Sequence, residues 1–398
     1  MQNSSKILFL EINRYNFTFF VANEDRGSNC KIIHKLIIPQ KGFDNSRISN
    51  YETALNFLKE NIYLIEQKLN FTFKEIILIL ENFNTTYLNL SGFKKLNGTQ
   101  ISKEDIIYIL NTLKFSINEI EKKKFLIHIF NSKFILDYKE VENLPIGLFG
   151  DFYSHELSLS LIDQNEYRNL IKIFDNCNLR IKKILLRSFI KGAFISDNNR
   201  NLSNFFIIQI NSNHSKIIYF ENDSLKFEQE FNFGMDIVLR DICKITLLEK
   251  DKVELILDKI NFQEKISEDE LVEEELFEKG QYRKIKKNLI YEIAHARIKE
   301  ILNLMIFENI NLNYYFKSTK VLFFEDKTNF QSQNLGEIFK SISSTKNELD
   351  FKFLKHLTYE KMINTLNQLV HYGWKKEAIP VTTPKKSIIS RLFGILFD

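Results

Sequence analysis

Residues arranged for catalysis or metal binding are scarce in this chain. Its seven histidines include no HxxxH or HExxH pair, and no Gly-x-Ser-x-Gly sequence marks a nucleophile. Cys30, Cys177 and Cys243 are far apart and form no CxxC motif, so they indicate neither a zinc site nor a disulfide framework. Asp236 and Asp241 are too far apart along a predicted helix to act as a paired acid and base. We therefore predict no catalytic residue and no metal site.

Length and composition indicate a folded protein of two to three domains. The 398 residues are 44% hydrophobic and 27% charged, which is enough apolar material for a large core. The net charge of +4 is too small to indicate a nucleic-acid-binding protein. The N-terminus has no signal-peptide pattern, and no run approaches the length of a transmembrane helix. We expect reduced cysteines in a cytoplasmic protein.

Alternating strand and helix signals predict an α/β fold built from two similar halves. Residues 6–22 are typical of two paired strands, and 205–232 of a second set of hairpin-linked strands. Apolar residues at helical spacing predict a helix over 51–70, and Ser102 with Asp105 forms the capping pattern of another helix. Further strands are expected at 30–39, 76–80, 125–138, 151–163, 180–186 and 320–324, and further helices at 165–177, 234–260, 283–307, 333–342 and 359–372.

Several local sequences resemble, in the same order, segments of FtsA, the actin-like protein of bacterial cell division. Pro145-Ile146-Gly147-Leu148-Phe149-Gly150 resembles the family's Asn-Pro-x-Gly-Leu-x-Gly segment. Ile101 to Ile106 resembles the start of a family helix, and the string covering Glu292 to Glu300 resembles another, with Arg297 on its arginine. The other matching segments are 169–179, 233–236 with 241–242, and Thr365 with 371–373.

The resemblance implies an actin-like fold, which is a duplicated ribonuclease-H-like α/β architecture. A small 1C subdomain is inserted, and the usual 1B subdomain is absent. The two halves would enclose a nucleotide cleft. The implied divisions are 1–74 and 156–203 for subdomain 1A, 75–155 for 1C, 204–262 for the first part of 2A, 263–312 for 2B, 313–375 for the end of 2A and the closing helices, 376–386 for a linker, and 387–398 for an amphipathic membrane-targeting helix.

The family's two phosphate-binding turns fall on segments that lack glycine here. Such turns need glycine because the backbone approaches the phosphates closely. The first turn falls on residues 11–14 and the second on 209–214, where the family's acidic residue is replaced by glutamine. The positions of this degenerate cleft are Glu11, Asn13, Gln209, Asn211 and Asn213.

Asparagine tolerates positive φ, so Asn13, Asn211 or Asn213 could keep the shape of its turn, but none of them would leave the space that a phosphate needs. The family's adenosine-binding glycines fall near Glu325-Asp326, where carboxylates would repel a polyphosphate. We predict a pseudo-ATPase that needs no cofactor. The alternative is a working ATPase that binds ATP with magnesium and uses it to control polymerisation at the division site.

The last residues form a strongly apolar tail. Residues 376–386 contain two prolines and two threonines and are typical of a linker. Residues 387–398 place one narrow polar face against a broad apolar one, with Lys385, Lys386 and Arg391 supplying cations. We expect this helix to lie in the membrane interface, as the family's membrane-targeting tail does, and the alternative is that it packs against its own domain. The membrane-binding side chains would be Ile388, Ile389, Leu392, Phe393, Ile395, Leu396 and Phe397.

An acidic run over 268–278 precedes a basic stretch over 283–287. Such segregated charge is most simply solvated surface. In the family this region belongs to subdomain 2B, which receives the C-terminal peptide of FtsZ partly through basic side chains. The corresponding candidates are Arg283, Lys286, Lys287, Arg297 and Lys299.

The resemblance thus implies an adaptor at the cytoplasmic face of the bacterial cell membrane, located at the division site. It would bind anionic lipid, capture FtsZ filaments, self-assemble as an actin-like filament, and contact other division proteins through 1C. A remoter possibility is a pilus-type actin-like protein related to PilM, but the amphipathic tail argues against it.

Overall fold

The structure, a computed structural model, divides into two compact units. The described residues of Met1–Ser203, Glu221–Lys226 and Thr358–Asp398 form unit 1, and those of Asn204–Phe220 and Phe227–Leu357 form unit 2. The residues that the structure describes are 5–24, 30–199, 202–259, 269–277, 282–312, 315, 319–326, 338–342, 349–354 and 357–377.

The main sheet of unit 1 is built from five strands, β1 (Ser5–Ile12), β2 (Asn16–Glu24), β3 (Cys30–Pro39), β6 (Glu75–Leu80) and β11 (Arg180–Leu186). β1, β2 and β3 form an antiparallel meander, and β6 and β11 continue the sheet in parallel on the other side of β1. The spatial order is therefore β11-β6-β1-β2-β3. β6 is almost wholly apolar because both of its faces are buried. A two-residue hairpin pair, β4 (Phe43–Asp44) and β5 (Arg47–Ile48), lies outside this sheet.

Unit 1 contains the helices α1 (Tyr51–Leu69), α3 (Gln164–Asp175), α4 (Arg187–Asn198) and α9 (Tyr359–His371). α1 confirms the helix predicted from apolar spacing, and it buries Leu58, Ile62 and Ile65 on one face. α4 follows β11 directly and has no counterpart among the predicted helices. Most of its residues are buried, polar ones included, so its sequence shows no one-sided apolar pattern.

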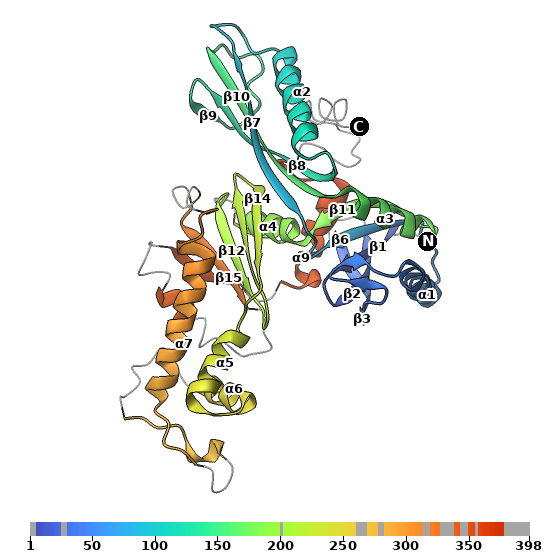
Figure 1. Ribbon diagram of the computed structural model, residues 1–398. Helices are drawn as coiled ribbons and strands as arrows, with labels where there is room; N and C mark the ends of the chain where they lie inside the picture. The colour runs from blue at the N-terminus through green and yellow to red at the C-terminus, as the bar shows by residue number, and fades with distance from the viewer. Residues whose placement is uncertain are drawn as a thin grey trace. The chain divides into compact units, whose positions relative to one another are not determined.

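A four-stranded antiparallel sheet and one helix form the rest of unit 1 (Figure 1). The strands, in spatial order, are β7 (Thr86–Lys95), β10 (Phe152–Asp163), β8 (Lys124–Leu136) and β9 (Lys139–Val141), and the helix is α2 (Lys103–Ile120). The sheet and helix span residues 86–163, whereas the resemblance implies residues 75–155 for 1C. β6, at the start of that range, is a strand of the five-stranded sheet.

The start of α2 confirms the capping pattern read from the sequence. The Ser102 hydroxyl accepts a hydrogen bond from the Asp105 backbone N–H at 3.2 Å, and the Asp105 carboxylate accepts one from the Ser102 N–H at 2.7 Å. Gly92 lets this helix approach β7, because a Cβ at that position would lie 2.5 Å from Cγ2 of Ile109. Local sequence and close packing therefore both fix α2 on the sheet.

A second five-stranded sheet repeats the topology of the first. Its strands are β12 (Phe205–Ile210), β13 (Ser215–Glu221), β14 (Ser224–Phe231), β15 (Val321–Asp326) and β16 (Asp350–Phe353). Their order is β14-β13-β12-β15-β16, with β12 antiparallel to β13, and with β15 and β16 added in parallel on the other side. Each sheet thus has three meander strands followed by two parallel ones. This duplication confirms the two similar halves predicted from the sequence and is the arrangement expected of an actin-like α/β fold.

The described helices of unit 2 include α5 (Asp236–Thr246), α6 (Lys250–Lys259) and α7 (Lys287–Leu302), with a 3₁₀ turn η1 (Glu274–Leu276) and a π turn η2 (Asn303–Phe307). Residues 338–342 are also helical, which agrees with the end of the helix predicted over 333–342; residues 333–337 lie outside the described part of the chain. The predicted single helix over 234–260 is broken, because Leu247 ends α5 with a φ of +57°. The predicted basic helix start is also wrong, since Lys286 has extended backbone and α7 begins after it.

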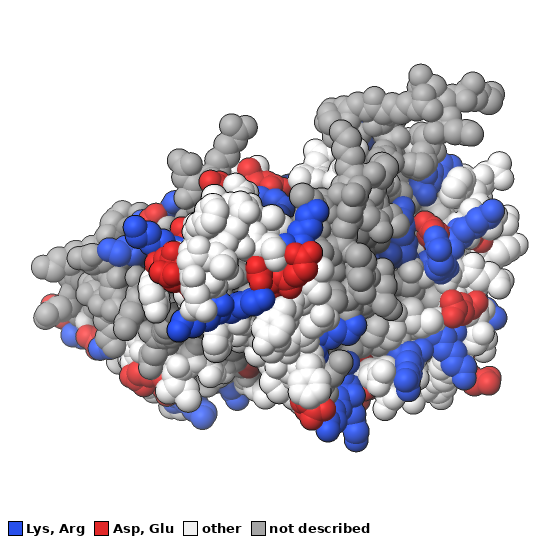
Figure 2. All heavy atoms as spheres, turned by 90° about the horizontal axis from the view of Figure 1, so that it is seen from above, with Lys and Arg blue, Asp and Glu red and all other residues white. Residues whose placement is uncertain are grey.

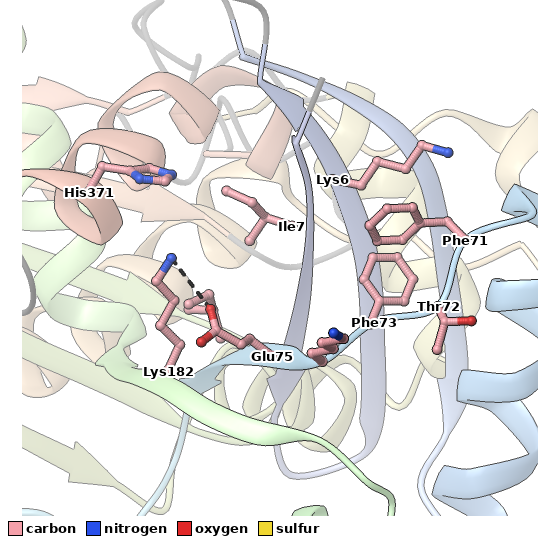
Figure 3. A pocket seen from close by; sticks show the side chains of 10 residues that line it. Lys6, Ile7, Phe71, Thr72, Phe73, Glu75, Lys182 and His371 are labelled. Atoms are coloured by element: carbon pink, nitrogen blue, oxygen red, sulfur yellow. Dashed lines mark ion pairs between the residues drawn. The ribbon is translucent and has the colours of Figure 1, made fainter. Parts of the chain in front are cut away.

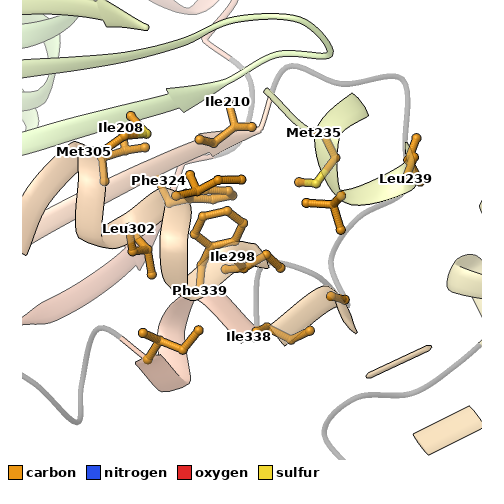
Figure 4. Close-up of a cluster of buried hydrophobic side chains, with 14 of the residues drawn as sticks. Ile208, Ile210, Met235, Leu239, Ile298, Leu302, Met305, Phe324, Ile338 and Phe339 are labelled. Atoms are coloured by element: carbon orange, nitrogen blue, oxygen red, sulfur yellow. The ribbon is translucent and has the colours of Figure 1, made fainter. Parts of the chain in front are cut away.

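The core of unit 2 joins its sheet to these helices (Figure 4). Ile208 and Phe324, from neighbouring strands, meet Ile298 and Met305 of the helical segment that follows Lys286, and all four side chains are buried. The sheet end that carries the second predicted phosphate turn is therefore held on an apolar support.

Candidate functional site

The first predicted phosphate turn connects β1 to β2 and is closed by the side chain of Asn13. The Asn13 Oδ1 accepts hydrogen bonds from the backbone N–H groups of Tyr15 and Asn16, both at 2.9 Å. The Asn13 N–H in turn donates to the Asn16 carbonyl oxygen at 3.2 Å. Two amides of the kind that anion-binding turns present to a ligand are thus satisfied inside this turn.

Glu11 precedes this turn and is buried against a cation and near an aromatic ring. Its Oε1 lies 3.9 Å from Nε of Arg187, and both side chains are less than a tenth exposed. The Arg187 guanidinium lies over the ring of Tyr359, 4.0 Å from the ring centre. Burial raises the pKa of Tyr359 well above its ordinary value, so the phenol remains neutral. The three residues join β1, α4 and α9.

The second predicted turn connects β12 to β13 and rests on the start of α5. The backbone N–H groups of Met235 and Asp236 donate to the carbonyl oxygens of Asn211 and Ser212, both at 2.9 Å. Gly234 permits this approach, because a Cβ there would lie 2.1 Å from the Asn211 oxygen. Amides near a helix start are ready anion donors, and here the turn itself uses two of them.

The asparagines of the two turns do not use the left-handed backbone that asparagine tolerates. Asn13, Asn211 and Asn213 are absent from the described non-glycine residues with positive φ. None of the three therefore replaces glycine by adopting left-handed backbone. At Asn13 the carboxamide, rather than backbone freedom, determines the turn.

Gln209 and Glu325 occupy paired positions on the adjacent parallel strands β12 and β15. The Gln209 Nε2 donates a hydrogen bond to Oε2 of Glu325 at 2.6 Å, and both side chains are buried. The Leu357 N–H donates to the other carboxylate oxygen at 3.3 Å. A carboxylate at position 209 would place two like charges in contact away from water, whereas the amide supplies a donor.

Arg297, one of the predicted partner-binding residues, is held between two helices. It forms ion pairs with Asp241 of α5 and with Glu300 of its own helix, α7. Asp236 is also paired, with Lys250 at 3.0 Å. The two aspartates noted in the sequence are therefore bound separately to cations and form no acid–base pair.

The other four basic candidates divide into two kinds. Lys286 and Lys287 form ion pairs with carboxylates of the acidic segment 269–273. Arg283 and Lys299 have no ion pair within the part of the chain that the structure describes. These two side chains are therefore the better placed to meet an acidic partner.

Charged side chains of both signs are interspersed on the face shown in Figure 2. Among the described residues, no group of three or more His, Cys, Asp or Glu side chains could hold a metal ion. Over the same residues, no helix is both long and apolar enough to cross a membrane. The predicted membrane-binding residues 388–397 lie outside the described part of the chain.

The curated proteins that match this sequence share one name. No protein-family model matches the chain. It is 22% identical over 306 residues to the cell division protein FtsA of Buchnera aphidicola subsp. Schizaphis graminum, which covers 76% of this chain and 73% of that protein. It is 23% identical over 304 residues to FtsA of the subspecies Baizongia pistaciae, covering 75% and 71%. The chain is thus similar to FtsA over about three quarters of its length.

Solved structures also align along most of this chain. A PilM-PilN type IV pilus biogenesis complex aligns with a TM-score of 0.49 and 8% identity, covering 88% of each chain. MreB5 of Spiroplasma citri bound to ADP aligns with a TM-score of 0.42 and 10% identity, covering 92% of this chain and 95% of that one. The duplicated sheet topology and the sequence similarity to FtsA are the observations that support an actin-like fold.

The sequence segments that resemble FtsA did not indicate that Arg187 and Tyr359 lie at the first turn. Both residues reach Glu11 from elements that lie far from it in sequence. Arg187 does carry a usable signal, because a charged residue at the junction of an apolar strand and an apolar helix requires a buried partner. The partner itself is defined only by the packing of the three elements.

Proposed function

We propose that the chain is an actin-like cell division protein that tethers FtsZ filaments to the cytoplasmic membrane and does so without ATP. Its relatives are named cell division protein FtsA, which supports a role in division. The independence from ATP rests above all on Asn13, whose Oδ1 accepts hydrogen bonds from the amides of Tyr15 and Asn16.

A phosphate at this turn would have to displace the Asn13 carboxamide. It would compete for two hydrogen bonds, each with a net value of about 0.5–1.5 kcal/mol, and would also need the space that the side chain fills. In unit 2, Glu325 adds a buried carboxylate beside the position where the family has an acid that helps to place magnesium. The closed turn at Asn13 and the negative charge of Glu325 are therefore two separate arguments against polyphosphate binding.

Tethering would come from many weak contacts rather than from chemistry. The seven apolar side chains of 388–397 would each contribute about 1.5–3 kcal/mol on burial, less the cost of ordering the tail. An FtsZ C-terminal peptide would meet basic side chains of unit 2, with Arg283 and Lys299 as the primary contacts. Self-association into a filament would multiply both attachments at the cytoplasmic face of the division site, and the inserted 1C subdomain would contact other division proteins.

Calorimetric titration of the full chain with Mg-ATP tests the nucleotide part of the proposal. We expect no saturable heat, which corresponds to a Kd weaker than about 1 mM. Micromolar saturable binding would contradict the proposal and support the alternative, in which ATP controls polymerisation. A chain with Asn13→Gly serves as the matched comparison, since it frees the two amides without changing the rest of unit 1.

A further inference from the structure

A pocket of about 570 Å³ opens in unit 1 at the edge of the sheet where β1 and β6 begin (Figure 3). Its lining comes from the start of β1, from residues 71–77, from β11, and from the last residue of α9. Pockets of about 300–1,000 Å³ are typical of small-molecule sites. The pocket is therefore large enough to enclose a compact organic ligand.

The interior of this pocket is apolar. Ile77 and Phe73 are buried, and Ile7 is half-buried. Phe71 packs edge-on against Phe73 with ring centroids 5.0 Å apart. Figure 3 shows these two rings on one side of the pocket, with His371 on the other and Ile7 between them. The space between an aromatic pair and an imidazole suits a flat or branched apolar group.

The rim of the pocket is cationic. Lys6, Lys74 and Lys182 line it, against a single carboxylate, Glu75. That carboxylate is already paired with Lys182 at 3.6 Å and with Arg180. A hydrogen bond from Arg180 lowers the pKa of Glu75, so it remains ionised and bound to these cations. The lining residues therefore carry more positive than negative charge, which favours a negatively charged ligand.

Lys6 is held in place at the mouth of the pocket. Its Nζ donates to the Leu69 carbonyl oxygen at 3.1 Å and lies 5.1 Å from the centre of the Phe71 ring. A tethered ammonium loses less side-chain entropy when it meets an anion than a free one does. Lys6 therefore provides a preorganised contact for a negative group next to the aromatic pair.

The pocket is distinct from the degenerate phosphate turn. Lys6 stands at the start of β1 and Asn13 just beyond its end. At about 3.3 Å per residue, seven residues of strand separate them by about 23 Å. A molecule in the pocket would not reach the Asn13 turn, so its binding is independent of the proposed loss of ATP.

From the apolar interior and the lysine rim, we infer that this pocket binds a small organic anion, one that joins a flat apolar body to a single carboxylate or phosphate. The body lies between Phe71 and Ile7, and the anionic group meets Lys6 and Lys74. A neutral molecule of the same shape would gain the apolar contacts but not the charge contacts.

Calorimetric titration of the full chain compares 1-naphthoate with the uncharged 1-naphthalenemethanol. We expect one binding site per chain and about tenfold tighter binding of the carboxylate, an advantage that falls as salt is raised. Lys74→Glu, at an exposed position, and Lys6→Glu should each remove this advantage. Lys139→Glu, an exposed lysine of β9 elsewhere in unit 1, should leave it unchanged.

Three results would overturn the inference: equal affinity for the two probes, several weak sites per chain, or an advantage unaffected by Lys74→Glu. Far-UV circular dichroism shows whether each variant is folded. If Lys6→Glu does not fold, Lys74→Gln and Phe71→Ala carry the test, with weaker carboxylate binding expected for both.

Discussion

The Nζ of Lys183 lies 3.1 Å from Oε2 of Glu377, and both side chains are only 3% exposed. The other carboxylate oxygen accepts from Nδ1 of His128 at 3.1 Å, since Nε2 of that imidazole accepts the Leu186 N–H. Burial alone would raise the pKa of Glu377, but Lys183 and His128 lower it below its ordinary value. Glu377 lies within the predicted linker, 376–386, and is the last residue that the structure describes, so this buried group fixes the start of that segment on β11.

Replacing Glu377 with alanine should strongly destabilise unit 1, because it leaves Lys183 buried without its carboxylate. We expect a loss of about 3–5 kcal/mol in the free energy of unfolding. The chain has a single tryptophan, Trp374, whose Nε1 donates to the Asp223 carbonyl oxygen at 2.7 Å, so its fluorescence in a urea titration reports on unit 1. The control is Glu360→Ala, which removes an exposed pair with Lys35 and should cost about 0–1 kcal/mol. Similar losses for both variants would refute the structural role of Glu377.

Stability of unit 1 should fall in mild acid because of His155. Burial lowers the pKa of His155 to about 3, from an unfolded value of 6.5. Below pH 6.5 the unfolded chain therefore takes up a proton that the folded chain does not, so stability is complete above this pH and decreases toward pH 3. The expected slope from this residue is about 1.4 kcal/mol per pH unit.

Urea titrations of the native chain and of His155→Gln, at pH 7.5, 5.5 and 4.5, measure this slope. Burial also lowers the pKa of His128, so a residual dependence of the same sign is expected in the variant. Identical pH profiles for the two chains would show that His155 is protonated equally in the folded and unfolded states.

Converting Gln209 to glutamate should destabilise unit 2 by about 1–3 kcal/mol at pH 7, because it opposes a second carboxylate to Glu325. Far-UV circular dichroism in a denaturant titration measures the loss. The swapped chain, Gln209→Glu with Glu325→Gln, keeps one amide and one carboxylate and should recover most of the stability. If the swapped chain is as unstable as Gln209→Glu alone, repulsion between two carboxylates at these positions is not the cause of the lost stability.

FtsZ-peptide binding should depend on the two basic candidates that have no ion pair in the described structure. Arg283→Glu and Lys299→Glu should each weaken binding by up to about fivefold, the scale of an exposed ion pair. Fluorescence anisotropy of a labelled FtsZ C-terminal peptide gives the affinity, and Lys244→Glu, an exposed lysine of α5, is the control. If all three chains bind alike, this peptide does not use these side chains.

Local sequence rules predicted much of the fold. The Ser102–Asp105 cap and the buried face of α1 follow from residue types within one or two helical turns. The break at Leu247 could not be predicted in this way, because a bulky residue with positive φ is disfavoured locally and persists only through packing. Periodicity therefore gave the helical segment but not its division into two.

The candidate site was less predictable, because its contacts join distant segments. The absence of glycine from the two turns was evident in the sequence, yet it did not indicate that the Asn13 carboxamide would accept the turn amides. Arg297 was expected to be available to a partner, but its bond to Asp241 crosses from one helix to another. Residue type gives the capacity for such bonds, and only packing selects the partner.

Co-sedimentation of FtsZ filaments with anionic lipid vesicles tests the central claim most directly. GTP is supplied for FtsZ, and each sample is measured with ATP and without it. The full chain is compared with a chain ending at Glu377, which retains the buried group around Lys183. We predict that FtsZ pellets with vesicles only when the full chain is present, and equally well with or without ATP. Recruitment that requires ATP, or that persists with the shortened chain, would contradict the account.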